Sequence, residues 1–169
     1  MKLKQILNEI GDSNQIPSGA KFLVLKNSGE VEFSFLGDKY LIHIRIPIQQ
    51  NNRIALTIDF YTLENNMDLT NKGQALKVMS YVVGCIEEWI KRYNKKFNQT
   101  EIVYIKYDPK SEESEEQDFD KISKNESANK RDRLYRTFIE KFAKRYNSNV
   151  TFTTQGGVVA KFEPNLIVK

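Results

Sequence analysis

Apolar and polar residues alternate with a period of two through the first third of the chain, which is typical of strands with one buried face. Turn-forming residues interrupt this alternation at Asn27-Ser28-Gly29, Gly37-Asp38 and Gln50-Asn51-Asn52. The pattern predicts four consecutive antiparallel strands, over residues 22–25, 31–35, 40–46 and 54–61. Pro47 has no N–H to donate to a sheet, so it should end the third strand or place it near an edge.

The period changes to 3.6 residues after residue 70, which predicts a long amphipathic helix ending near Asn94. Thr70 or Asn71 is the expected N-cap, and Asn71 and Gln74 have the spacing of a capping box. The strand-like run at 101–107 follows, so the helix should connect two parallel strands in a right-handed crossover. The predicted buried stripe of this helix is Ala75, Met79, Val82, Val83, Ile86, Ile90 and Tyr93.

The last third of the chain begins with an acidic segment. Residues 108–125 contain seven acidic residues and three lysines but few apolar ones, which predicts a flexible acidic loop. Residues 150–154 and 158–162 flank Gly156-Gly157 and should form a terminal hairpin. Between the acidic segment and this hairpin a second helix is expected over 128–146. Its buried face is made of Leu134, Tyr135, Phe138, Ile139, Phe142 and Tyr146.

These elements predict an α+β fold in a single domain. The 169 residues have the usual length of one domain, here residues 20–169, preceded by a lead-in segment at 1–19 whose first ten residues favour a short helix. No apolar run approaches the roughly 18 residues of a membrane span, and the amino-terminal residues lack the features of a signal peptide. We therefore expect a soluble, cytoplasmic protein with no membrane partner.

Only one cysteine and one histidine are present, so neither a disulfide framework nor a zinc site is expected, and the sequence predicts no metal site. Cys85 lies among apolar residues and is interpreted as a small buried filler. His43 lies within an alternating run and is interpreted as a strand residue rather than a catalytic base.

The net charge of +4 is unevenly distributed: residues 108–125 carry −4 and the rest of the chain +8. A basic body is compatible with binding nucleic acid or a phosphorylated small molecule, and with ordinary solubility. One hypothesis is therefore a nucleic-acid interface on the second helix, whose alternative is a solvated helix face. Its basic residues are Lys130, Arg131, Arg133, Arg136, Lys141, Lys144 and Arg145.

The order of predicted elements from residue 20 to 163 resembles the GNAT superfamily of N-acetyltransferases. That family binds the pyrophosphate of acetyl-CoA at the amino end of its central helix, after a Q/R-x-x-G-x-G/A motif. The matching stretch here is Thr70-Asn71-Lys72-Gly73-Gln74-Ala75, with Gly73 and Ala75 at the small positions and Thr70 in place of Gln or Arg. The resemblance implies a cofactor site at residues 71–75, supported by Lys72 and Lys77, because helix amino ends attract anions.

The same resemblance implies a catalytic role for Tyr135. In this family a tyrosine on the following helix often protonates the leaving thiolate of coenzyme A, and Leu134-Tyr135 resembles that position. Tyr135 also lies on the stripe of Phe138 and Phe142, which favours a core aromatic as the alternative. Asp59, Glu64 and Asp68 are the candidates for a general base, and solvated acids are their alternative interpretation.

Two functional hypotheses follow from the resemblance. The chain looks like the compact acetyltransferase-like proteins encoded by bacteriophages, which would place it in a host cytoplasm or a virion. Such a protein either binds acetyl-CoA and transfers the acyl group, or uses the same scaffold without catalysis to contact a viral or host protein. The absence of the family's two helices between its first and second strands counts against the first hypothesis. In the second hypothesis the acidic loop at 112–120 faces a protein partner or mimics phosphate.

Overall fold

The computed structural model describes residues 15–62, 75–98, 101–108, 120–154 and 157–168. The predicted helix within residues 1–10 and the N-cap candidates Thr70 and Asn71 lie outside these ranges. The described elements, in chain order, are β1 (Lys21–Val24), β2 (Ser28–Phe35), β3 (Asp38–Gln50), β4 (Arg53–Thr62), α2 (Ala75–Phe97), β5 (Glu101–Tyr107), α3 (Asp120–Arg145), β6 (Asn149–Thr154) and β7 (Val158–Leu166).

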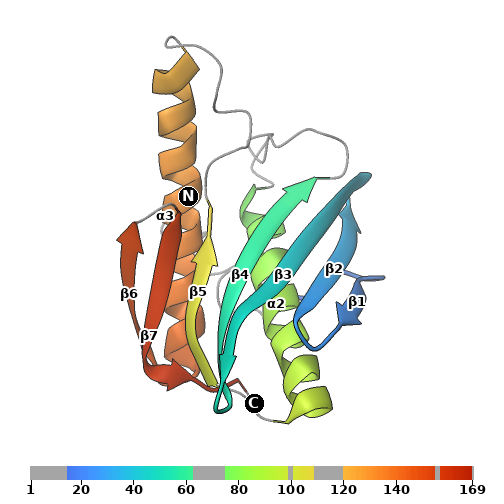
Figure 1. Cartoon of the computed structure of the whole chain (residues 1–169). Coiled ribbons are helices and arrows are strands. Elements are labelled where there is room, and N and C mark those ends of the chain that lie inside the picture. Colours follow the sequence, from blue (N-terminus) through green and yellow to red (C-terminus); the bar gives the residue numbers. More distant parts are fainter. Residues whose placement is uncertain (1–14, 63–74, 99–100, 109–119, 155–156, 169) are drawn as a thin grey trace.

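The described strands form one sheet in the order β1-β2-β3-β4-β5-β7-β6 (Figure 1). Neighbours are antiparallel except β4 and β5, which are parallel and are connected in the chain by α2. The fold is thus a mixed α+β structure with a mostly antiparallel sheet. The predicted meander, the parallel pair around the first long helix and the terminal hairpin are confirmed.

Both described helices pack against the same face of the sheet, α2 behind β2 to β4 and α3 behind β5 and β7 (Figure 1). β2 and β3 bury every second side chain under the helices, as the period of two predicts. On β3, for example, Tyr40, Ile42 and Ile44 are buried, whereas Leu41 and His43 are only partly buried on the other face. One core therefore joins the meander, both helices and the terminal hairpin.

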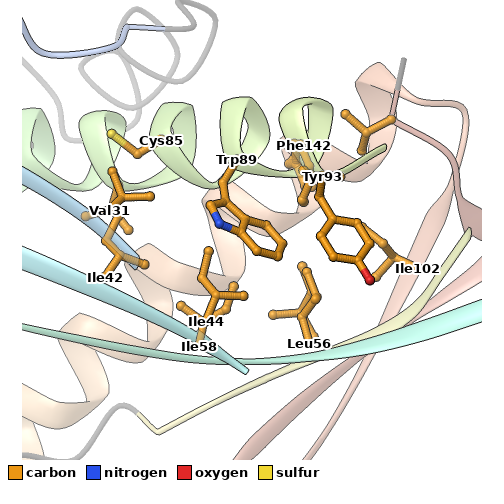
Figure 2. Packing of buried hydrophobic residues seen from close by; sticks show 14 of the residues in the cluster. Val31, Ile42, Ile44, Leu56, Ile58, Cys85, Trp89, Tyr93, Ile102 and Phe142 are labelled. Carbon is orange, nitrogen blue, oxygen red and sulfur yellow. The ribbon is translucent and has the colours of Figure 1, made fainter. Parts of the chain in front are cut away.

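Two buried aromatic residues of α2 connect this helix to the amino-terminal hairpin (Figure 2). Trp89 is fully buried and its indole Nε1 donates a hydrogen bond of 2.9 Å to the carbonyl of Leu23. The Tyr93 hydroxyl donates to the carbonyl of Lys26 over 2.9 Å, and the two rings are stacked with centroids 5.2 Å apart. Their polar atoms are thus satisfied while their rings fill the centre of the core.

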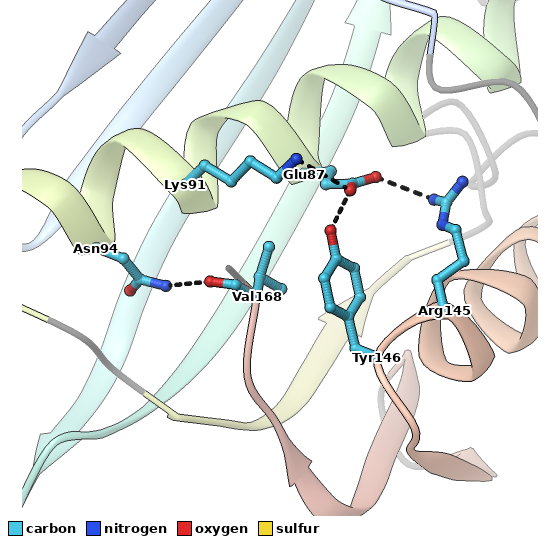
Figure 3. A network of polar contacts seen from close by, with 6 residues as sticks. All are labelled: Glu87, Lys91, Asn94, Arg145, Tyr146 and Val168. Carbon is cyan, nitrogen blue, oxygen red and sulfur yellow. Dashed lines mark hydrogen bonds and ion pairs between the residues drawn. The ribbon is translucent and has the colours of Figure 1, made fainter.

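A buried carboxylate connects α2 to the end of α3 (Figure 3). The side chain of Glu87 is 3% exposed and accepts a hydrogen bond of 3.0 Å from Arg145 and another from the Tyr146 hydroxyl. Lys91, one turn further along α2, approaches the same carboxylate at 3.5 Å. These partners compensate a charge that would otherwise be costly to bury.

The tight turns of the meander have positive φ values. The β2–β3 turn lies at Leu36-Gly37, one residue before the predicted Gly37-Asp38, because Asp38 already begins β3, whereas the β3–β4 turn lies where it is predicted. Leu36 and Gly37 have φ values of 51° and 86°, and Asn51 and Asn52 have values of 52° and 64°. Two consecutive residues with positive φ are characteristic of the type I′ turns that connect antiparallel strands. The β2–β3 and β3–β4 connections are therefore encoded locally.

Two predictions within the meander are wrong in detail. Gly29 does not belong to the first turn but to β2, where it pairs with Val24 and faces the indole of Trp89. Pro47 does not end the third strand, because β3 continues to Gln50 through a bulge between Arg45 and Ile48. The bulge interrupts the hydrogen-bond ladder at the residue that has no N–H to donate.

The helix boundaries also differ from prediction. The first helix continues to Phe97, three residues beyond Asn94, and is followed by Asn98 in the left-handed conformation with φ of 69°. The second begins at Asp120 rather than at 128, so the predicted loop over 108–125 is too long at its carboxyl end.

Within the described residues, neither helix combines the length and the apolar composition needed to cross a membrane.

Candidate functional site

An apolar cavity of about 50 Å³ lies between the two helices and the parallel strands. Its walls come from all four elements, so it exists only because α2 and α3 pack side by side over β4 and β5. The lining residues are Ile58, Phe60, Met79, Val82, Val83, Ile86, Ile105, Tyr107, Asp108, Tyr135, Ile139 and Phe142.

The cavity lies toward the carboxyl ends of the two parallel strands. The last pair between them is Ile58 with Tyr107, and β4 continues to Thr62, four residues beyond that pair. Figure 1 shows the amino end of α2 at the same edge of the sheet as the tips of these strands. Carboxyl ends of parallel strands and amino ends of helices are where ligands commonly bind in α/β structures.

The polar lining of the cavity consists of Tyr107, Asp108 and Tyr135. The rings of Tyr107 and Tyr135 lie with centroids 5.0 Å apart and planes inclined by 50°. The Tyr107 hydroxyl donates to Oδ1 of Asp132 over 3.1 Å, and Arg136 donates to Oδ2 of the same carboxylate over 2.9 Å. The arrangement fixes the ring of Tyr107 and places the phenol of Tyr135 beside it.

Burial is the main cause of a raised pKa at Tyr107, and the nearby Asp132 carboxylate raises it further. The tyrosine therefore stays protonated and acts as a hydrogen-bond donor in this environment, rather than as an acid that readily loses its proton.

We expect this environment to make the stability of the protein sensitive to alkaline pH. Because the pKa of Tyr107 is raised above 10.0, the tyrosine ionises first in the unfolded chain, so its contribution to the free energy of unfolding should be constant below about pH 10 and fall above it. Tyr107→Phe should weaken this alkaline loss, while costing about 1 kcal/mol at pH 7 through the lost hydrogen bond. Thermal melts of both proteins from pH 7 to 11.5 measure this, and equal alkaline slopes would contradict it.

The predicted catalytic residue Tyr135 lies on the cavity wall, half-buried on α3. Of the predicted cofactor residues, Ala75 is the first residue of α2, whereas Asn71, Lys72, Gly73 and Gln74 lie outside the described residues. Two of the three general-base candidates, Glu64 and Asp68, lie outside them too, and Asp59 forms a 2.9 Å ion pair with Arg45.

Lys77, proposed to support the cofactor phosphates, is directed elsewhere in this structure. Its ammonium donates a hydrogen bond to Oε1 of Gln15 and lies 5.1 Å from the centre of the Tyr81 ring. Tyr81 in turn packs against Phe33 and Phe35 of β2. Lys77 therefore faces the amino-terminal hairpin and not the cavity.

No family model matches this chain, and no match was found among curated proteins or among solved structures.

The basic face proposed for nucleic acid on α3 is used in part for internal contacts. Arg136 pairs with Asp132 and its guanidinium lies 4.9 Å from the centre of the Phe152 ring. Arg145 pairs with the buried Glu87. These two cations stabilise the fold, which leaves less positive charge on this helix for a phosphate backbone to contact than the sequence predicts.

The single cysteine and the single histidine of the sequence lie in a helix and a strand, respectively. Cys85 is fully buried, as predicted, and burial is the main cause that raises the pKa of its thiol to about 12. His43 lies on β3 in register with Glu30 of β2 and Asp59 of β4. Within the described ranges, no group of three or more His, Cys, Asp or Glu side chains could hold a metal ion.

Sequence reasoning did not identify Tyr107, Asp108 and Asp132 as members of a site. Tyr107 shares the strand face of Ile105, so the alternation places it on the helix side. Asp132 and Arg136 have the i, i+4 spacing of a helix ion pair. The sequence does not show that β5 ends opposite this turn of α3. Only the tertiary structure brings the two together.

Proposed function

We propose that this chain is an acetyltransferase-like protein that binds acetyl-CoA where α2 begins, of the compact kind encoded by bacteriophages. The observation that carries the proposal is the cavity at the carboxyl ends of the parallel strands, beside the amino end of α2 and with Tyr135 on its wall. Further support comes from the element order: the meander, long helix, strand, helix and terminal hairpin on which the resemblance rests are all present.

Each part of acetyl-CoA has a chemically suitable counterpart in this arrangement. The first turn of a helix has backbone N–H groups without intrahelical partners, and Gly73 and Ala75 would let a pyrophosphate approach them closely. The pantetheine arm would lie along the carboxyl end of β4, which continues beyond its last pair with β5. The Tyr135 phenol would then protonate the leaving thiolate, whose basicity is comparable to its own.

A second candidate function is a non-catalytic scaffold that contacts a viral or host protein. The observation that favours it is the short connection between β1 and β2, only residues 25–27, where enzymes of the superfamily have two helices that help to hold the acyl acceptor. In that case the cavity and Tyr135 are parts of the core. The two candidate functions predict different results for acetyl-CoA: the acetyltransferase-like protein binds it, and the non-catalytic scaffold does not.

Substitution Gly73→Glu tests the proposed cofactor site. A carboxylate at the helix amino end should repel the pyrophosphate, so we expect acetyl-CoA affinity to fall at least tenfold, measured by titration calorimetry. Ser34→Glu adds the same charge at an exposed position of β2 and should leave the affinity unchanged. Wild-type affinity in the Gly73→Glu variant would exclude this site, and no binding by the wild-type protein would favour the scaffold.

A further inference from the structure

The cavity has a strongly polarised lining. Its polar residues are Tyr107, which ends β5, Asp108, which follows it, and Tyr135 on α3. Every other lining residue is apolar, and the walls continue along the helices to Ile86 on α2 and Phe142 on α3. A site with polar groups at one end and hydrocarbon beyond is suited to a ligand of the same build, with a polar head and an apolar tail.

The depth and volume of the cavity limit the length of the apolar tail that it can receive. Tyr135 and Phe142 are seven residues apart on α3, so the lining extends about 10 Å along the helix. A volume of 50 Å³ corresponds to roughly three to five water-sized groups. The apolar part of the cavity does not favour water, because its walls offer no hydrogen-bond partners, but it can receive a short hydrocarbon chain.

The charge at the polar end of the cavity restricts which polar head group the ligand can have. The residues that line the cavity include one carboxylate, Asp108, and no cation. A free fatty acid would bring a second negative charge close to the exposed carboxylate of Asp108, and no cation of the lining would compensate it. A neutral carbonyl avoids that repulsion and can accept a hydrogen bond from a phenol such as that of Tyr135. The lining therefore favours a neutral acyl derivative over a free acid.

From these observations we infer that the cavity receives the acyl chain of a coenzyme A thioester longer than acetyl, of about four to six carbons. The inference rests on the proposed function and specifies its substrate class. The thioester carbonyl lies at the polar end beside Tyr135, and the chain extends between Val83 of α2 and Ile139 of α3. Affinity then rises with chain length, because each additional CH₂ group leaves water for an apolar wall.

The test is a binding series with coenzyme A, acetyl-CoA, butyryl-CoA and hexanoyl-CoA, and with free hexanoate, measured by titration calorimetry on the wild-type protein. Burial of one CH₂ group is worth about a fourfold gain in affinity, so hexanoyl-CoA, which has four more CH₂ groups than acetyl-CoA, should bind roughly 250-fold more tightly. Hexanoate should bind far more weakly than hexanoyl-CoA. Because this series needs no variant, it does not depend on the folding of a mutant.

Two cavity-filling variants and one control variant show whether the acyl chain binds in the cavity. Val83→Phe fills the cavity from α2 and should abolish the dependence on chain length while keeping the affinity for acetyl-CoA; Met79→Phe is a second filling variant should the first unfold. Val159→Phe makes the same change on β7, at a residue that does not line the cavity, and should keep the wild-type dependence.

The outcomes separate the inference from the proposed function. Equal affinity for all thioesters, or a length dependence that survives filling of the cavity, overturns the inference and leaves acetyl-CoA binding intact. If hexanoate binds as tightly as hexanoyl-CoA, the inference that the ligand is a thioester is wrong. Absence of binding by every coenzyme A compound overturns the proposed function, and the inference with it.

Discussion

Replacement of Gly29 by alanine is expected to lower the free energy of unfolding by about 3 kcal/mol. An ideal Cβ at this position would lie 2.6 Å from Cζ2 of Trp89 and still closer to Nε1 and Cε2 of the indole. The indole cannot easily move, because it is fully buried, stacked on Tyr93 and hydrogen-bonded to the Leu23 carbonyl. Equilibrium denaturation with urea, followed by circular dichroism, measures the change.

Two further variants identify the clash as the cause. Ser34→Ala, at an exposed position of the same strand, should change stability by less than about 0.5 kcal/mol. In a Trp89→Phe background the alanine at position 29 should cost less than in the wild-type protein, because the smaller ring leaves room for the methyl group. An equal cost in both backgrounds would show that the indole is not the obstacle.

Removal of the Arg145 charge by Arg145→Met is expected to cost about 2 to 3 kcal/mol. Breaking a buried ion pair typically costs about 3 to 5 kcal/mol, because the remaining charge stays buried without its partner. Here Glu87 keeps Tyr146 and Lys91, which should reduce the loss (Figure 3). The methionine retains most of the apolar stem of the arginine, so the measured loss in urea unfolding reports mainly the charge.

Lys91→Met is the matched comparison for this prediction. Its ammonium lies 3.5 Å from the same carboxylate, but 39% of its side chain is exposed, so its loss should cost less than about 1 kcal/mol. Combining Arg145→Met with Glu87→Leu should recover part of the loss, because the orphaned carboxylate is then removed. A neutral effect of Arg145→Met would mean that the Arg145 ion pair does not stabilise the contact between α2 and α3.

The fold follows closely from local sequence patterns. The alternation on β3 specifies which residues face the helices, Gly37 and the pair Asn51-Asn52 mark the hairpin turns to within one residue, and the 3.6-residue stripe specifies the buried face of α2. Each of these signals acts within a few residues. The errors arise where distant residues decide: Gly29 is required by Trp89, which is far away in sequence, and a bulge against β4 accommodates Pro47.

The candidate site was predictable only in part. The pattern of α3 places Tyr135 on a buried face, but it cannot show whether that face meets a solid core or a cavity. The cavity depends on how α2 and α3 pack over the end of the parallel pair, and the hydrogen bond from Tyr107 to Asp132 depends on the same packing. Lys77 shows the reverse: its charge favours a phosphate ligand, whereas its tertiary contacts are with Gln15 and Tyr81.

The central claim is that the cavity between the helices is the binding site for an acyl-CoA, and methyl NMR during a titration with acetyl-CoA tests it most directly. With isoleucine and valine methyl groups labelled, the account predicts shifts at the lining residues Ile58, Val83 and Ile139. Ile54 and Ile102, at the starts of the two parallel strands, should stay unchanged. Saturating acetyl-CoA without shifts at the lining residues, or shifts confined to other parts of the protein, would contradict the account.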